Sequence, residues 1–449
     1  MKSGGASLYH EDMYDPAVPV GSLWEETAEP LTVGPAFEGP QSCDTAIIGG
    51  GYTGLSAAYH LAKDHGVDVC LLEAGPLGWG ASGRNGGFCA PYPSSLGLET
   101  LLSRYGAEEA RRFMKTQEEA IDLVRALAKD EAFDIEAQGQ GVWHIAHDAR
   151  RFSGLQKEAD LLREAFGQKT AVASREEVAE RVYDSTEQFG GMWWGAGFGL
   201  HPMRFARGLG HAAARAGARL HGQSKVLSWA KQGEWHELET AGGILRAKNV
   251  IVATNGFTRE TFDKRFAGRV LPIISNIIAT RPLTAAERAA QNWLTDEPCT
   301  NTRRLLFYYR LLPDGRFIFG GRGDMSGTAE DGARMKAFLT RRLGEVFPAW
   351  AEVPVTHFWR GLVCMTRNQT PAIGRLKDDP SVLYGLGYHG DGVAAAPWTG
   401  RFLAQLLAGR ASEADLPAPM RGPLSPFPLP GLRRWYLRGA LVYYFMTDL

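Results

Sequence analysis

The sequence predicts an α/β fold in which a β-rich α+β domain is inserted into a Rossmann-like dinucleotide-binding domain. The first observation is a strand, turn, helix and strand succession over residues 44–73 that carries the spacing G-x-G-x-x-G. The second is a pair of aromatic-rich segments, 305–310 and 316–320, on either side of a Pro-Asp-Gly turn sequence. Such a turn predicts a β-hairpin. A chain of 449 residues suits two joined domains.

Composition excludes several classes of protein. Hydrophobic residues make up 44% of the chain and charged residues 22%, as in ordinary globular proteins. The 49 basic and 50 acidic residues nearly balance, which gives no electrostatic case for binding nucleic acid. Five scattered cysteines without a CxxC pair predict neither a disulfide framework nor a metal site, and they fit a cytoplasmic protein. No apolar run reaches 18 residues, so no transmembrane segment is expected.

The two ends of the chain differ from its body. Residues 1–42 are polar and rich in Gly and Pro, and we interpret them as an extended arm that Trp24 anchors. Residues 411–449 form a tail with a terminal helix. We expect this helix to pack on the body or on a partner subunit of a homo-oligomer, although its arginines offer binding to anionic lipid as an alternative.

The remaining elements are expected in the following order. Helices are predicted over 107–130, 150–166 and 203–217, and a capping box at Ser174 and Glu177 predicts another. Strands are predicted over 141–147, 225–230, 235–240 and 245–253. The dinucleotide-binding domain is therefore expected to comprise 43–95, 200–258 and 355–410, and the inserted domain 96–199 and 259–354.

The glycine fingerprint has a physical explanation. Gly49 allows the turn, Gly51 lets the backbone approach a pyrophosphate, and Gly54 lets helix and strand pack closely. Glu73 follows Gly51 by 22 residues and can accept hydrogen bonds from ribose hydroxyls. The alternative interpretation is a glycine-rich turn without a ligand.

A second glycine-rich loop, residues 78–87, distinguishes FAD from NAD. Its backbone N–H groups can meet the phosphate and the isoalloxazine of an extended dinucleotide, which a plain NAD domain has no need to hold. The alternative is a flexible surface loop. We therefore expect FAD as the cofactor.

These motifs resemble a known family. GGGYTGLSAAYHLA, LLEAGPLGWGASGRNGG, VIVATNGF (250–257) and YGLGYHGDGVAAAPWTGRFLAQLLAG (384–409) look like the D-amino-acid oxidase superfamily of FAD-dependent oxidoreductases. The form GWGASGRNGG most resembles its γ-glutamylputrescine oxidoreductase branch. The resemblance covers nearly the whole chain in the right order.

The resemblance implies a set of cofactor-binding residues, with Glu73 on the ribose. Cys364 does not align with the cysteine that tethers flavin in some relatives, so we expect FAD to be bound non-covalently. The expected cofactor-binding residues are Gly49, Gly51, Tyr52, Thr53, Gly54, Glu73, Ala74, Gly80, Ala81, Ser82, Arg84, Asn85, Gly86, Gly87, Val226, Ala253, Thr254, Gly256, Gly387, Gly390, Asp391, Gly392 and Val393.

The loop before residue 393 precedes a helical pattern, and the dipole of a helix start favours the negative charge of a reduced flavin. The branch has Ser and His where this chain has His389 and Asp391. His389 is therefore a candidate catalytic residue, with a structural histidine as the alternative. Tyr309 and Arg310 are the other catalytic candidates, although strand alternation sends them to opposite faces.

Further aromatic and basic residues are expected at the substrate. Phe88, Tyr308, Trp359 and Arg360 are the candidates, and packing of the aromatic residues in the core is the alternative.

The resemblance implies oxidation of an amine C–N bond by hydride transfer to flavin N5. The imine then hydrolyses to a carbonyl compound, and oxygen or another acceptor reoxidises the flavin. Val363 stands where glycine- and sarcosine-oxidising relatives have a carboxylate-binding Arg. A γ-glutamylated or otherwise extended amine is therefore favoured over small amino acids, unless Arg84 or Arg322 replaces that Arg. The alternatives are an amino-acid oxidase or dehydrogenase, and a non-catalytic electron-transfer subunit.

Overall fold

The computed structural model describes residues 7–91 and 94–447 and contains two eight-stranded sheets. The glycine fingerprint follows β1, a strand of the first sheet. The strand order is β17-β18-β11-β1-β2-β8, and β10 and β9 extend from β11. β1 pairs in parallel with β2 and β11, and β11 in parallel with β18, as expected of a Rossmann-like domain. The strands are β1 (Gln41–Ile48), β2 (Val69–Leu72), β8 (Arg219–His221), β9 (Ser228–Gln232), β10 (Trp235–Thr240), β11 (Gly243–Val252), β17 (Ala372–Leu376) and β18 (Asp379–Leu386).

The second sheet is mainly antiparallel, with the order β16-β12-β15-β14-β13-β4-β6-β5. It contains the expected hairpin, because β14 and β15 pair antiparallel across the Pro-Asp-Gly turn. Its strands are β4 (Val142–Ile145), β5 (Thr170–Ala173), β6 (Gly191–Trp194), β12 (Val270–Thr280), β13 (Cys299–Asn301), β14 (Phe307–Leu311), β15 (Phe317–Arg322) and β16 (Val355–Thr366). β3 (Phe88–Cys89) and β7 (Phe198–Gly199) form a separate two-stranded ribbon.

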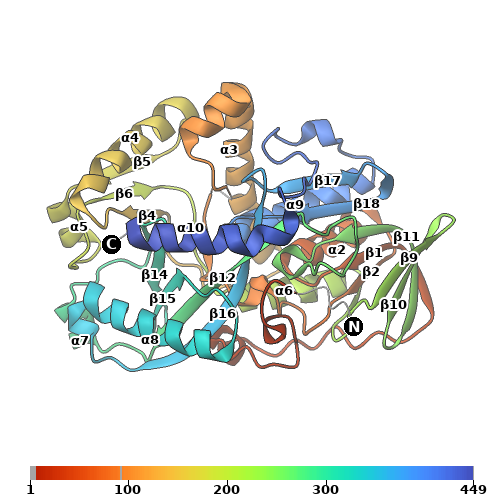
Figure 1. The fold of residues 1–449 in the computed structure, drawn as a ribbon, viewed down its shortest axis with the longest axis horizontal. Coiled ribbons are helices and arrows are strands. Elements are labelled where there is room, and N and C mark those ends of the chain that lie inside the picture. The colour runs from red at the N-terminus through yellow and green to blue at the C-terminus, as the bar shows by residue number, and fades with distance from the viewer. Residues whose placement is uncertain (1–6, 92–93, 448–449) are drawn as a thin grey trace.

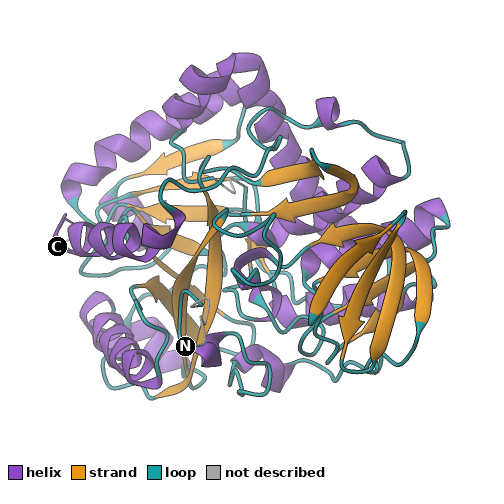
Figure 2. Ribbon diagram, turned by 45° about the vertical axis from the view of Figure 1, so that its right-hand side comes forward, coloured by secondary structure: helices purple, strands orange, loops and turns teal. Residues whose placement is uncertain are grey.

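Helices cover both sheets, with the first sheet on the right of Figure 1 and the second on the left. Figure 2 shows the same layers from another side. α2 and α9 pack against each other in the dinucleotide-binding part. The helices are α1 (Leu23–Thr27), α2 (Tyr52–His65), α3 (Leu98–Asp130), α4 (Ala149–Phe166), α5 (Arg175–Arg181), α6 (Pro202–Arg215), α7 (Ala285–Ala290), α8 (Ala329–Val346), α9 (Gly392–Leu407) and α10 (Arg433–Thr447).

One strand lies in a different sheet from the one expected. β16 was expected in the dinucleotide-binding part, but it pairs with β12 along nearly its whole length in the second sheet. The sequence alone could not assign it, because a strand's partner is a tertiary choice. The long helix expected over 107–130 is confirmed. It forms the main part of α3, and the non-helical Gly106 (φ 80°) joins it to a shorter helical segment that begins at Leu98. The capping box that opens α5 is confirmed.

The N-terminal arm is anchored as expected. Trp24 is 2% exposed, and its indole N–H donates to the backbone oxygen of Asn85 at 2.8 Å. The arm therefore fastens directly onto the second glycine-rich loop.

The terminal helix α10 crosses the front of the molecule in Figure 1 and packs on the body. Leu437 and Leu441 are buried in a cluster with Ile274 of β12 and Leu362 of β16. No helix among residues 7–91 and 94–447 is long and apolar enough to cross a membrane.

Candidate functional site

A cavity of about 560 Å³ opens between the two sheets, with walls from both. It is lined by most of the residues expected to contact cofactor or substrate: Gly49, Gly51, Tyr52, Thr53, Glu73, Ala74, Gly80, Ala81, Ser82, Arg84, Asn85, Gly86, Phe88, Val226, Ala253, Thr254, Tyr308, Gly390, Asp391, Gly392 and Val393. Segments from five distant parts of the chain therefore meet in one site.

The three fingerprint glycines have the geometry that the motif requires. Gly49 has φ +112°, and a Cβ there would lie 2.7 Å from the Ala253 oxygen. A Cβ at Gly54 would lie 1.9 Å from the oxygen of Gly49, so only glycine lets α2 begin this close to the turn. Gly51 instead borders the cavity, and the nearest atom to its Cβ position is Ser82 Oγ at 2.9 Å. The first and third glycines serve packing, and the second leaves room for a ligand.

The start of α2 faces the cavity without a side-chain cap. Gly51 is the N-cap, and Tyr52 donates its backbone N–H to Ser82 Oγ at 2.9 Å. Helix starts attract anions because their N–H groups and dipole point outward. This end of α2 is suited to a pyrophosphate.

Glu73 lies at the end of β2 and lines the cavity. Its carboxylate oxygens accept backbone N–H groups from Gly50 at 2.6 Å and Gly75 at 2.9 Å. Burial raises the pKa of Glu73, and these N–H groups oppose the rise. Each oxygen keeps a second lone pair, so the carboxylate is oriented to accept hydrogen bonds from ribose hydroxyls.

Arg84 provides a test of whether a cofactor fits. Its Nε donates to the Trp79 oxygen at 2.8 Å, and its guanidinium lies 4.3 Å from the Trp79 ring centroid. Its Nη2 is buried without a hydrogen-bond partner, although Arg84 lines the cavity. Burial lowers the pKa of Arg84 to about 10, which leaves it protonated at neutral pH. A buried donor without a partner is costly, and an acceptor atom of FAD would satisfy it.

Asp391 and Arg322 form the charged wall at the opposite end. Asp391 is the N-cap of α9 and makes no side-chain capping bond. Burial raises its pKa to about 7, and the nearby Arg322 opposes that rise. Arg322 Nη2 lies 3.4 Å from the His389 oxygen and 3.0 Å from the position of a Cβ on Gly390. Both side chains line the cavity.

His389, a predicted catalytic residue, lies outside the cavity lining. It is 3% exposed. Its Nδ1 pairs with Ser95 Oγ at 3.0 Å and its Nε2 with Thr366 Oγ1 at 3.2 Å. Burial lowers its pKa to about 3, so the ring stays neutral. These contacts favour the structural alternative for His389.

Tyr309 and Arg310, the other predicted catalytic residues, also lie outside the cavity lining. Tyr309 faces the aromatic core of the second sheet, where its hydroxyl pairs with Tyr183 at 2.6 Å. Arg310 is 1% exposed and donates to the backbone oxygens of Gly86 at 3.0 Å and Leu200 at 2.6 Å. Its guanidinium therefore holds the loop that borders the cavity, which favours a structural role.

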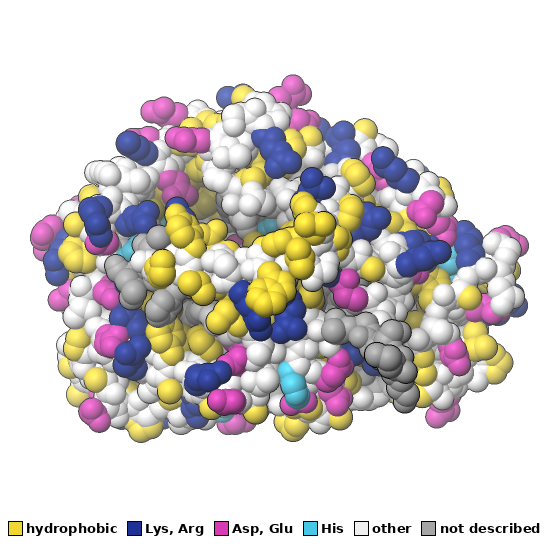
Figure 3. Space-filling model, viewed as in Figure 1, with side chains coloured by type: hydrophobic (Ala, Val, Ile, Leu, Met, Phe, Trp, Pro, Cys, Tyr) yellow, Lys and Arg dark blue, Asp and Glu magenta, His cyan; other side chains and the backbone are white. Residues whose placement is uncertain are grey.

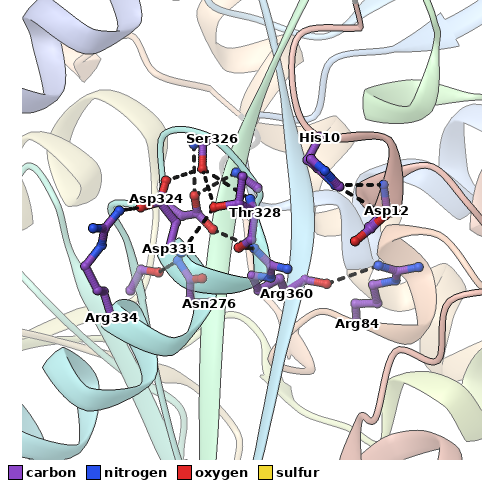
Figure 4. Close-up of polar contacts among 12 residues, drawn as sticks. His10, Asp12, Arg84, Asn276, Asp324, Ser326, Thr328, Asp331, Arg334 and Arg360 are labelled. Carbon is purple, nitrogen blue, oxygen red and sulfur yellow. Dashed lines mark hydrogen bonds and ion pairs between the residues drawn. The ribbon is translucent and has the colours of Figure 1, made fainter.

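Trp359 and Arg360 were expected at the substrate, but they do not line the cavity. Trp359 is 1% exposed and donates its indole N–H to the Arg84 oxygen at 2.8 Å. Arg360 forms an ion pair with the fully buried carboxylate of Asp324 at 2.9 Å. Figure 4 shows Arg360 turned into this polar network, which also includes Thr328. Both residues support the cavity wall from behind.

Four residues that were expected to contact the cofactor lie behind the cavity wall. Gly54, Gly87, Gly256 and Gly387 do not line the cavity. A Cβ at each would collide with a neighbouring segment within about 3 Å. Their lack of a side chain therefore lets those segments lie close together.

Phe88 and Tyr308 are confirmed as cavity residues. Their rings meet edge to face at 5.7 Å, and the Tyr308 hydroxyl pairs with Ser275 Oγ at 2.8 Å. Arg322 was expected only as a possible replacement for the missing carboxylate-binding arginine, and it lines the cavity. A signal for it existed, because Tyr308 lies opposite Gly320 in the hairpin, and Arg322 follows two residues later on the same face.

The open helix start, the oriented acid of β2 and the second glycine-rich loop together define a dinucleotide-dependent flavoenzyme. The chain belongs to the family described as FAD dependent oxidoreductase (DAO), whose model matches residues 44–406. Its cofactor is therefore FAD, and the α2 start, Glu73 and Arg84 are the groups that would hold it. The FAD cofactor agrees with the free donor of Arg84, the open start of α2 and the orientation of Glu73.

Characterised and named relatives cover nearly the whole chain. It is 34% identical over 412 residues to the probable oxidoreductase OrdL of Rhizobium meliloti, covering 92% of this chain and 94% of the relative. It is 32% identical over 416 residues to the γ-glutamylputrescine oxidoreductase of Escherichia coli, covering 91% and 93%. The chain is thus an oxidoreductase of a family that acts on amines or amino acids.

Solved structures agree with the fold. A glycine oxidase from Geobacillus kaustophilus superposes with a TM-score of 0.67 at 20% identity, over 83% of this chain and 96% of the other. An L-amino acid deaminase from Proteus myxofaciens gives 0.70 at 16% identity, over 88% and 96%.

Replacing Gly51 with leucine should abolish FAD binding, because the side chain would enter the pyrophosphate's place and displace Ser82. The flavin-to-protein absorbance ratio of the purified variant measures this. Gly154→Leu is the control, since nothing lies within 4 Å of a Cβ there. Full flavin content in Gly51→Leu would refute the assignment.

FAD should be released by acid precipitation, because Cys364, which lines the cavity, is a poor nucleophile. Burial raises the pKa of its thiol to about 12, and the thiolate is the reactive form. The measurement is flavin absorbance in the supernatant after precipitation. Colour retained in the washed pellet would show a covalent link.

Proposed function

We propose that the protein oxidises an amine at the carbon next to its nitrogen. Bound FAD supplies the hydride acceptor for this chemistry. The protein's task is to hold the amine in its neutral form, oriented and shielded from water. The two aromatic rings of Phe88 and Tyr308 supply an apolar surface for that purpose.

The observation that carries the proposal is the wall formed by Arg322 and Asp391. Both line the cavity, and no ion pair joins their side chains in the described part of the chain. A carboxylate beside an amine stabilises the ammonium and can accept its proton at Oδ. A guanidinium on the same wall is suited to a carboxylate of the substrate. The site therefore favours an amine that also carries a carboxylate.

A γ-glutamylated or similarly extended amine is the substrate class that we favour. One supporting fact is the similarity to the E. coli γ-glutamylputrescine oxidoreductase. The other is Val363, which lines the cavity where an arginine would serve a small amino acid.

Oxidation of an amino acid is the second candidate, and Arg322 is the observation that favours it. The argument from Val363 holds only if no other arginine, such as Arg84 or Arg322, takes the place of the missing one. Arg322 does reach the cavity wall, from β15 and not from β16.

An anaerobic screen tests the proposal, with flavin bleaching as the readout. The compounds are γ-glutamylputrescine, putrescine, sarcosine, glycine and a set of D-amino acids. Bleaching by one of them without added pyridine nucleotide supports amine oxidation. Flavin that is reduced only by a partner protein would contradict it.

Replacing Arg322 with methionine should weaken the use of carboxylate-bearing substrates. Removing one partner of a buried charge pair costs about 2 kcal/mol or more, so kcat/KM should fall about 30-fold or more. N-acetylputrescine, which has the amine and no carboxylate, should change little. Arg316→Met is the control, because Arg316 pairs with Asp314 on the same hairpin outside the cavity. An equal fall in kcat/KM for both substrates would show that Arg322 does not bind the carboxylate.

The rate should rise with pH in two steps. The raised pKa of Asp391, about 7, means that its carboxylate is protonated below this pH and accepts a proton only above it. kcat/KM for an amine should therefore rise through neutral pH and again towards the amine's own pKa, about 10.4. Asp391→Asn should lose the first step and keep the second. A pH profile with the same first step in both proteins would exclude this role.

A further inference from the structure

The terminal helix α10 is apolar on two opposite faces, although only one of them is covered. Leu437 and Leu441 on its inner face are buried against the body. Trp435, Val442 and Met446 recur at helical spacing on the other side and are 65%, 52% and 66% exposed. A helix that is apolar all round is normally buried all round. The outer face of α10 is therefore exposed to solvent in the isolated chain.

Exposed apolar side chains are concentrated at this place. Seven of the twelve large apolar side chains that are exposed in the described part of the chain lie between residues 429 and 446. They form one strip over α10 and the turn before it, and Figure 3 shows hydrophobic side chains gathered across this face. A contiguous apolar strip of this kind marks an interaction surface, whereas scattered apolar residues do not.

The charge on α10 distinguishes between the possible binding partners of its exposed face. α10 carries Arg433, Arg434 and Arg438 and no acidic residue over 433–447. Arg433 is already used, because it is 2% exposed and pairs with Glu260 at 2.6 Å. Arg438 lies beside the outer face, 5.5 Å from the Trp435 ring centroid, and Arg434 lies on the flank of the helix near Tyr9 and Tyr14. The surface thus combines exposed Trp and Tyr rings with two arginines that form no ion pair within residues 7–91 and 94–447.

We infer that the outer face of α10 binds flat on an anionic phospholipid surface. Trp and Tyr favour the level of the lipid headgroups, apolar side chains enter just below it, and arginines bind the phosphates. A second copy of the chain would cover the apolar strip equally well, but it would bring the arginines of two helices together without an acidic partner on either α10. Like charges at an interface oppose association. The helix lies on the surface and does not span it.

The position of α10 links this surface to the cavity. Leu437 and Leu441 pack in one cluster with Leu362, and Leu362 lines the cavity. One wall of the cavity therefore lies a single helix away from the bound lipid. This inference does not depend on the identity of the amine.

Flotation of the FAD-loaded protein with vesicles tests the inference. Vesicles of phosphatidylcholine with about 30% phosphatidylglycerol should carry the protein upward, and pure phosphatidylcholine should carry much less, because each surface arginine adds attraction to anionic lipid. Trp435→Ser with Met446→Ser should weaken binding about 100-fold or more, since each large apolar side chain contributes roughly 10-fold when buried. Arg434→Gln with Arg438→Gln should remove the preference for anionic lipid.

Two controls accompany these variants. Leu294→Ser removes an apolar side chain that is 54% exposed elsewhere and should leave flotation unchanged. Flavin content and thermal unfolding of each variant establish that it is folded. Light scattering after gel filtration, without lipid, gives the oligomeric state.

Each outcome decides the matter. Flotation with anionic vesicles that both double variants lose supports lipid binding. Protein that stays at the bottom with both kinds of vesicle overturns the inference. A dimer that Trp435→Ser with Met446→Ser converts to monomer, with no flotation, would show instead that a second copy covers α10.

Discussion

The close approach of α2 to the turn that precedes it is the constraint on which the rest of the site depends. The Cβ position at Gly54 lies 1.9 Å from the oxygen of Gly49, so any other residue would push the helix away. That displacement would move the open helix start from the cavity and separate Ser82 from the N–H of Tyr52. The same helix packs against α9, which carries Asp391 at its start. One contact between two glycines thus positions both ends of the site.

Local patterns were sufficient to predict the dinucleotide-binding part. Strand, turn, helix and acid over 44–73 are adjacent in sequence, and the chemistry of the turn leaves few alternatives. The hairpin of β14 and β15 was predicted for the same reason, since Pro-Asp-Gly favours a turn. Resemblance to a family then extended the prediction to distant segments that no local rule connects, such as Val226 and Val393.

Residues of the second sheet were harder to predict because their roles are set by tertiary neighbours. Arg310 and Arg360 are charged residues near a cavity, and each is fully engaged on the side away from it. His389 has an aligned position at the site, yet its left-handed backbone, φ +55°, turns its ring towards Ser95 and Thr366. Arg322 and Asp391 do the reverse, since they are half-buried at the cavity and still lack ion-pair partners in the described part of the chain. Sequence gives the charge of a side chain, and the fold decides whether a partner has already neutralised it.

The order of strands in the first sheet has a consequence for the making of the protein. β1 leaves the ribosome early, but its neighbour β11 follows about 200 residues later, and β18 and α9 come near the end of the chain. Contacts over such separations form late, because a long loop must close before they contribute any stability. The start of α2 and Glu73 must therefore wait, with their polar groups in water, until α9 has been synthesised. The cofactor can join only a chain that already includes α9, so products of translation that stop before α9 would remain colourless and open to proteolysis.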